Sequence, residues 1–221
     1  MRSRLEHQLE TLRLELRKMG ALCEEAISAG VKALLECDDA MAQRAIACEE
    51  EIDEAEHSIE ALCMKLLLQQ QPVARDLRTI SSALKMISDM ERIGDQAADI
   101  AHLSAHFAAL PLPGQIHIGD MARAAIRMVT DSVESFAKKD LNMALGVIQY
   151  DDVVDGLFLS IQDELIALIR TDSTAAVQAL DLLMVAKYLE RIGDHAVNVA
   201  QWVIYSITGE YQTNAQQGEL L

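Results

Sequence analysis

Hydrophobic residues recur at intervals of three and four along most of the chain, and this spacing is typical of helices that bury one side. Turn-forming residues divide the pattern into six segments. We expect helices over about 5–36, 40–70, 72–106, 118–137, 141–170 and 174–206. Asp38, Asp140 and Asp172 stand near the starts of three of them, where a carboxylate can accept hydrogen bonds from free amides. Pro72 fits the first turn of the third helix.

The composition agrees with packed helices. About half of the residues are hydrophobic, yet only 4% are aromatic, and there are just three prolines. Two of the prolines lie in the segment 110–114 at the middle of the chain, which we interpret as a link between two halves. The predicted organisation is a first bundle over 1–108, a linker over 109–115, a second bundle over 116–208 and a polar tail over 209–221.

The two halves repeat each other. The segment 91–95, Glu-Arg-Ile-Gly-Asp, returns as 190–194, 99 residues later. On the preceding helices, Glu49-x-x-x-Asp53 matches Asp151-x-x-x-Asp155 at an offset of 102. Two copies of a three-helix unit explain both repeats. The sequence therefore predicts an all-α fold of two tandem three-helix bundles related by internal duplication.

The repeated acidic residues should face each other between neighbouring helices. Asp53 lies 18 residues before the turn near residue 71, and Glu91 lies 20 residues after it. In the second half, Asp155 and Glu190 lie 17 and 18 residues from the turn near residue 172. In an antiparallel arrangement of the two helices, the two residues of each pair would lie at the same height. Each acidic stripe also continues an apolar stripe, and burying an unpaired carboxylate there would cost free energy.

These acidic residues form two candidate metal sites. The candidate ligands are Glu49, Asp53, Glu91, Asp95 and Asp99 in the first half and Asp151, Asp155, Glu190, Asp194 and Asn198 in the second. An all-oxygen ligand set suits Mg, Mn or Ca, or iron bridged by carboxylates. Gly94 and Gly193 indicate either close helix approach or room for an ion. The competing interpretation is a solvated acidic face that Arg92 and Arg191 neutralise.

The net charge, the start of the chain and the cysteines indicate which partners and which cellular location are expected. Thirty-five acidic residues against 19 basic ones give a net charge of −16, which disfavours nucleic-acid and anionic-lipid partners. We expect no signal peptide, because the start is charged, and no direct membrane insertion. Four cysteines without a C-x-x-C pair are typical of reduced, semi-buried side chains in the cytoplasm.

No catalytic motif stands out. The chain has no P-loop, no G-x-G-x-x-G and no nucleophile elbow, so we expect no enzyme. Ferritin-like di-iron oxidases need two E-x-x-H motifs, and only Glu54 and His57 form one. His102 and His106 form an H-x-x-x-H step that is better explained as a surface pair than as metal ligands.

The motifs together resemble the PhoU family of phosphate-transport regulators. The resemblance rests on the repeated Glu-Arg-Ile-Gly-Asp motif, on its acidic partners and on the segment 71–78 (Gln-Pro-Val-Ala-Arg-Asp-Leu-Arg). Residues 9–10, 19–22 and 24–25 near the start also match the family pattern. The resemblance covers about residues 5 to 208. It implies a cytoplasmic, all-helical protein of two three-helix bundles that usually forms a homodimer. Such proteins are negative regulators of phosphate uptake and phosphate-starvation signalling.

The resemblance also implies partners and cofactors. The partners would be the PstB-type ATPase of the phosphate ABC transporter and the PhoR-type sensor histidine kinase, reached at the inner face of the membrane through the transporter. Family members can carry Fe, Zn, Mn or Mg on the acidic motifs. Asn198 replaces an acid of the family pattern, so the second site would hold fewer or weaker ions. A carboxylate-bridged metalloenzyme and an accessory protein of another phosphate transporter are the alternatives.

Overall fold

The protein is built from long helices, as the hydrophobic spacing predicts. The computed structural model describes residues 2–70, 72–107 and 116–211, and within these it contains no strand. The α-helices are α1 (Arg2–Glu36), α2 (Asp39–Gln70), α3 (Arg75–Ser104), α4 (Ile118–Lys138), α5 (Leu141–Thr171) and α6 (Ala176–Thr208), with short 3₁₀ turns η1 (Ala105–Phe107) and η2 (Ser173–Ala175). The predicted all-α fold of two tandem, duplicated three-helix bundles is confirmed.

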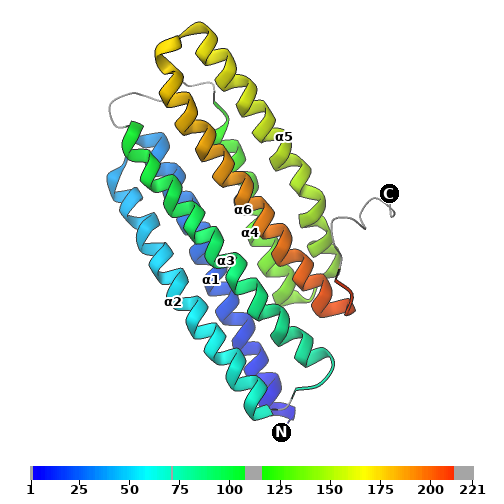
Figure 1. Cartoon of the computed structure of the whole chain (residues 1–221). Helices are drawn as coiled ribbons and strands as arrows, with labels where there is room; N and C mark the ends of the chain where they lie inside the picture. The colour runs from blue at the N-terminus through cyan, green and yellow to red at the C-terminus, as the bar shows by residue number, and fades with distance from the viewer. Residues whose placement is uncertain (1, 71, 108–115, 212–221) are drawn as a thin grey trace.

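The two bundles lie side by side and share one core. Helices α1 and α3 of the first half pack against α4 and α6 of the second, while α2 and α5 lie on opposite outer sides (Figure 1). A single cluster of buried apolar side chains extends through both halves. A Cβ atom added to Gly20 of α1 would lie 3.1 Å from Val133 of α4, so these two helices approach closely across the boundary.

Aspartates cap three of the turns between helices, as predicted. The Oδ1 atoms of Asp38, Asp140 and Asp172 accept hydrogen bonds from backbone amides two or three residues further on, at 2.9, 3.0 and 2.9 Å respectively. Each bond satisfies an amide that has no partner within the helix. Asp172 caps the turn η2, and α6 follows at Ala176, slightly later than expected.

The start of α3 differs from the prediction. Pro72 does not lie in its first turn, because the helix begins only at Arg75. Ala74 has φ 47 and ψ −112, a conformation outside the helical region, so helical hydrogen bonding cannot extend back to Pro72. The carbonyl of Val73 instead accepts a bond from the amide of Asp76 at 3.2 Å. The sequence spacing did not reveal this strained turn.

The remaining sequence predictions concern the linker, the tail, the cysteines and a membrane span. The predicted linker 109–115 lies outside the described residues, and so does the tail beyond Tyr211. Cys23, Cys48 and Cys63 are buried free thiols, whereas Cys37 is exposed. No helix in the described ranges is long and apolar enough to cross a membrane.

Candidate functional site

The helix pair α2–α3 brings the first set of acidic residues to one side. Ser88 of α3 donates a hydrogen bond to Glu56 of α2 at 3.1 Å, which fixes the register. Further along α3, a Cβ atom added to Gly94 would lie 3.0 Å from Cδ1 of Ile52. With this register, Asp53 and Glu91 lie near each other across the helix pair. Gly94 therefore allows close helix approach, one of the two roles expected for it.

We call Glu49, Asp53, Glu91 and Asp95 the first acidic row. Burial raises the pKa of Glu49, and the charges of Asp53 and Asp95 add to the shift. Burial and the charge of Asp95 likewise raise the pKa of Glu91, with a smaller contribution from Asp53. The four carboxylates therefore repel one another across α2 and α3. Arg92 relieves part of this repulsion, with nitrogen atoms 3.3 Å from Glu91 and 3.1 Å from Asp95.

The corresponding residues Asp151, Asp155, Glu190 and Asp194 form the second acidic row, between α5 and α6. Burial, followed by the charges of Asp155 and Asp194, raises the pKa of Asp151 to about 6. Burial and the charge of Glu190 also raise the pKa of Asp194. The second row thus repeats the first, and it contains the more strongly perturbed carboxylate.

Gly193 has a different neighbour from Gly94. A Cβ atom added to Gly193 would lie 3.4 Å from Oδ1 of Asp151, so the glycine leaves room for a carboxylate against the α6 backbone. A Cβ atom at position 193 would be in ordinary van der Waals contact with this carboxylate. Burial is also the largest cause of the raised pKa of Asp151.

A lysine joins the second row, and sequence reasoning missed it. Lys187 Nζ lies 2.5 Å from Glu190 Oε2, one helical turn before it. The signal was available, because residues three apart on a helix are neighbours. Arg92 plays the comparable role in the first row, in agreement with the competing interpretation of a partly neutralised acidic face.

Asp99 and Asn198 have partners in the opposite half of the molecule. Burial raises the pKa of Tyr188 on α6, and its side chain hydrogen-bonds Asp99 on α3. Asn198 Nδ2 donates to Asp89 Oδ1 at 3.0 Å, and His195 Nδ1 lies 2.9 Å from the same oxygen. Asp89 and Tyr188 are equivalent under the 99-residue repeat, as are Asp99 and Asn198. The duplication therefore creates two related contacts between α3 and α6.

The acidic rows have the chemistry of a cation site without a closed ligand shell. Within the described part of the chain, no three His, Cys, Asp or Glu side chains converge closely enough to hold a metal ion. The donors are all carboxylate oxygens, which suit hard divalent cations. Burial, followed by the charges of neighbouring carboxylates, raises the pKa values of Glu49 and Asp151, and a positive charge near them would be favourable. The donor type thus suits a hard cation, the carboxylates are not gathered into a ligand shell, and metal binding stays a prediction.

Comparison with known proteins agrees with the repeated architecture. The family model of the PhoU domain matches residues 16–104 and 118–203. A phosphate-specific transport system accessory protein PhoU homologue of Clostridium acetobutylicum is 37% identical over 212 residues, covering 93% of this chain and 94% of the relative. The homologue of the same name from Pseudomonas putida is 36% identical over 207 residues, covering 91% and 80%.

Solved structures give the same result in three dimensions. The crystal structure of PhoU from Pseudomonas aeruginosa matches with a TM-score of 0.86 and 33% identity, covering 93% of this chain and 99% of that one. The phosphate transport system regulatory protein PhoU from Streptococcus pneumoniae matches with a TM-score of 0.87 and 26% identity, covering 95% and 99%. Both halves of the sequence and the whole arrangement of helices show that this chain belongs to the PhoU family.

Proposed function

We propose that this protein is an accessory regulator of a phosphate-specific transport system, which restrains phosphate uptake and phosphate-starvation signalling. The observation that carries the proposal is the similarity, over nine-tenths of the chain, to relatives named as accessory proteins of that system. The segments that match the family model, 16–104 and 118–203, span both acidic rows and the turn before α3. The protein would act through contact with partners, without catalysing a reaction.

The acidic rows are the surfaces that we propose for this contact. They lie along the helix pairs α2–α3 and α5–α6, whose outer helices α2 and α5 are on opposite sides of the molecule (Figure 1). Their repelling carboxylates would favour a basic surface or a bridging cation. The partners that fit the proposal are a PstB-type transporter ATPase and a PhoR-type sensor histidine kinase. We further propose that the protein acts as a homodimer, which light scattering can measure.

Divalent or iron cations would bind in the acidic rows. The proposed ligands are the four carboxylates of each row; Asp99 and Asn198 already have partners across the α3–α6 contact. An ion would compensate the repulsion within a row, and Arg92 and Lys187 would move away from the carboxylates they contact. Elemental analysis after purification without chelator would identify Fe, Zn, Mn or Mg.

A calorimetric titration with Mn²⁺ tests the assignment of the ligands. The double variant Asp53→Asn/Glu91→Gln should lose the binding step of the first row and keep that of the second. Asp163→Asn removes an exposed carboxylate of α5 outside both rows and serves as the matched control. Unchanged Mn²⁺ binding by the double variant would contradict the assignment.

The regulatory proposal is tested with purified partners. The full chain should bind the transporter ATPase and lower the autophosphorylation of the sensor kinase, and neutralising the first acidic row should weaken at least one of these effects. Absence of binding to both partners would contradict the proposal. So would redox or hydrolytic turnover that disappears in Asp95→Asn or Asp194→Asn, because such turnover would identify a metalloenzyme.

A further inference from the structure

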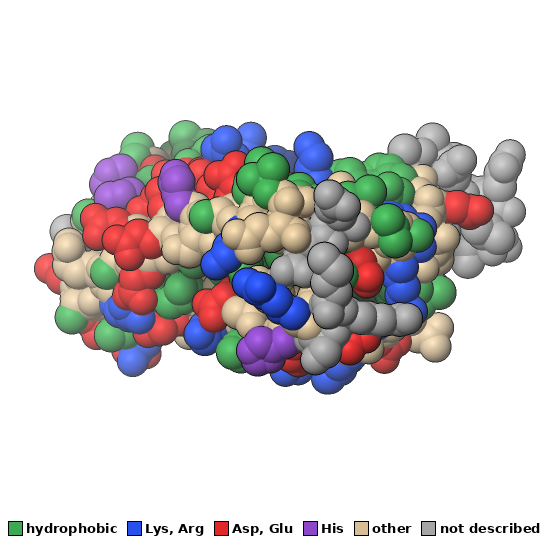
Figure 2. Space-filling model, turned by 90° about the horizontal axis from the view of Figure 1, so that it is seen from below, with side chains coloured by type: hydrophobic (Ala, Val, Ile, Leu, Met, Phe, Trp, Pro, Cys, Tyr) green, Lys and Arg blue, Asp and Glu red, His purple; other side chains and the backbone are tan. Residues whose placement is uncertain are grey.

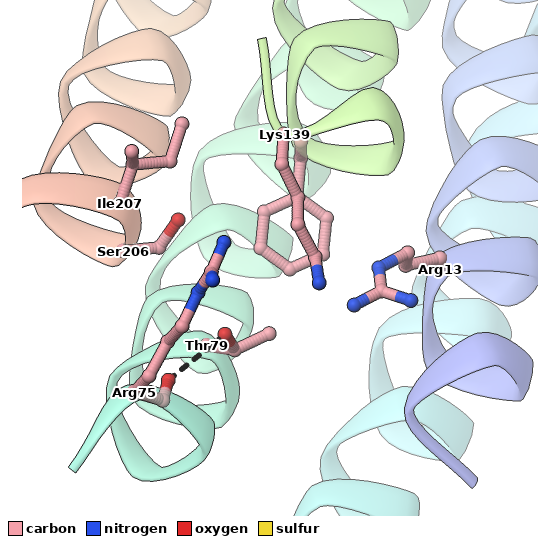
Figure 3. Close-up of a pocket in the computed structure, with 7 residues that line it drawn as sticks. Arg13, Arg75, Thr79, Lys139, Ser206 and Ile207 are labelled. Atoms are coloured by element: carbon pink, nitrogen blue, oxygen red, sulfur yellow. Dashed lines mark hydrogen bonds between the residues drawn. The ribbon is translucent and has the colours of Figure 1, made fainter. Parts of the chain in front are cut away.

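A small cavity lies at the end of the molecule where α3 begins and α6 ends. It is lined by Arg13, Arg75, Thr79, Phe136, Lys139, Ser206 and Ile207. These residues come from α1, α3, α4, the turn between α4 and α5, and α6, so both halves of the chain contribute (Figure 3). Figure 2 looks onto this side of the molecule, where Lys and Arg side chains stand near the middle of a surface that also carries many acidic groups.

Three cationic side chains converge on the cavity. The amino group of Lys139 lies between the guanidinium groups of Arg13 and Arg75 (Figure 3). Burial lowers the pKa of Lys139, and the charges of Arg13 and Arg75 lower it further. Like charges held close together are unfavourable. Acidic residues that could neutralise them are abundant in this chain, whose net charge is −16.

The carboxylates nearby leave much of this charge uncompensated. Arg13 Nη1 pairs with Glu10 at 2.8 Å, but its Nε atom is buried and has no hydrogen-bond partner among the described residues. Arg75 and Lys139 likewise form no ion pair with a carboxylate of the described residues. A buried nitrogen–hydrogen group without an acceptor is costly. The residues that line the cavity therefore include three cationic side chains and no carboxylate.

The backbone holds these groups in place. Lys139 occupies the left-handed conformation, with φ 56, that ends α4. Arg75 is the first residue of α3, whose preceding residue Ala74 supplies no capping side chain. The hydroxyls of Thr79 and Ser206 donate to backbone carbonyls at 3.0 and 2.7 Å, so the cationic groups are the donors left for a ligand.

We propose that this cavity binds inorganic phosphate. The space among the side chains is about 10 Å³, enough for about one water molecule, so phosphate would enter as the long arginine and lysine side chains move outward. A nucleotide is too large for it. Two guanidinium groups present forked donors that match tetrahedral oxyanions, and the lysine adds a point charge. Phosphate is a mixture of monoanion and dianion at neutral pH, and binding of the dianion would compensate most of the positive charge.

Phosphate is preferred over sulfate for a chemical reason. The charges of Asp76 and Glu10 act on Lys139, so carboxylates stand near the cationic groups. Hydrogen phosphate carries a proton that it can donate to such a carboxylate, whereas sulfate has none and would be repelled. The cavity thus combines donors for phosphate oxygens with nearby acceptors for its proton.

The site goes beyond the proposed function, because it gives the regulator a ligand of its own. It also assigns a role to Arg75 in the segment 71–78, which neither acidic row includes. The internal repeat does not duplicate the site, since the equivalent of Arg75 is Thr174, which carries no charge. Phosphate would contact residues of both halves and stabilise their packing against each other.

Calorimetric titration of the purified full chain with inorganic phosphate tests the proposal. We expect saturable binding, and a loss of affinity of at least about tenfold in Arg75→Gln and in Lys139→Gln. Lys138→Gln is the matched control, because this neighbouring lysine pairs with Glu134 at 3.1 Å and does not line the cavity. It should keep full affinity. Far-UV circular dichroism confirms that each variant folds.

Three results would overturn the proposal. One is the absence of saturable phosphate binding, and another is an equal loss in Lys138→Gln, which would show unspecific attraction to positive charge. The third is equal affinity for sulfate at the same ionic strength, which would overturn phosphate as the ligand. The measurement uses no transporter component, so its outcome is separate from that of the regulatory proposal.

Discussion

At the scale of single residues, the acidic rows show what spacing can and cannot predict. Repeated i, i+4 acids and matched distances to the turns predicted that Asp53 and Glu91 face each other, and in the structure the charge of Asp53 contributes to the raised pKa of Glu91. Spacing alone did not predict how deeply each carboxylate is buried. The burial of Asp151 depends on how closely α5 and α6 pack near Gly193, and the pairing of Lys187 depends on its rotamer.

The raised pKa of Asp151, about 6, makes a prediction about pH. An unfolded aspartate titrates near 4, so the fold disfavours the ionised carboxylate, and this penalty grows from about pH 4 to pH 6. Asp151→Asn should therefore stabilise the protein at pH 7.5 by roughly 1–2 kcal/mol, after allowance for partial exposure and salt. The gain should shrink toward zero as the pH falls to about 4.

Urea denaturation in the presence of chelator at several pH values measures this difference. Asp163→Asn, on the exposed side of α5, is the control and should change stability little at any pH. A variant Asp151→Asn that is no more stable than the wild type at pH 7.5, or that gains more at pH 4.5, would show that burial does not destabilise the ionised carboxylate.

At the scale of helices, hydrophobic spacing and capping residues predicted each element closely. The exception is α3, whose start depends on the conformation of Ala74, a residue with no distinctive turn preference. Close approach between helices is another property that spacing does not show. A Cβ atom added to Gly30 of α1 would lie only 2.7 Å from the backbone oxygen of Ala97 of α3, whereas one added to Gly146 of α5 would meet nothing within 4 Å.

These two glycines predict opposite effects of the same substitution. Gly30→Ala should destabilise the protein by roughly 1–3 kcal/mol, because a backbone atom cannot move aside without shifting a helix. Gly146→Ala should stabilise it by about 0.5–1 kcal/mol, because alanine loses less conformational entropy in a helix. Thermal denaturation followed by circular dichroism compares them. Similar effects of both substitutions would mean that α1 and α3 are not in close contact at Gly30.

At the scale of the whole molecule, the duplication predicted two bundles but not their shared core. Each unit could have buried its apolar side alone. In the structure, α1 and α3 also bury apolar residues against α4 and α6, and the repeated polar positions at 89 and 99 pair across this contact. An extra apolar face on a helix cannot be assigned to a partner from one sequence, because spacing does not identify what covers it.

The shared core predicts that the two halves unfold together. Trp202, the single tryptophan, lies on α6 and reports on the second half, whereas circular dichroism reports on all helices. Leu16→Ala, at a fully buried position of α1, should lower stability by about 2–5 kcal/mol and shift both signals equally. A tryptophan transition that does not move would contradict the shared core, since the first half would then unfold independently.

Phosphate-starvation reporter activity in cells grown with ample phosphate tests the regulatory role most directly. Deleting the gene should switch the reporter on, and the wild-type chain should switch it off again. The variant Asp53→Asn/Glu91→Gln should restore repression poorly, and Asp163→Asn should restore it fully. A reporter that stays off in the deletion strain would show that the protein does not restrain phosphate-starvation signalling.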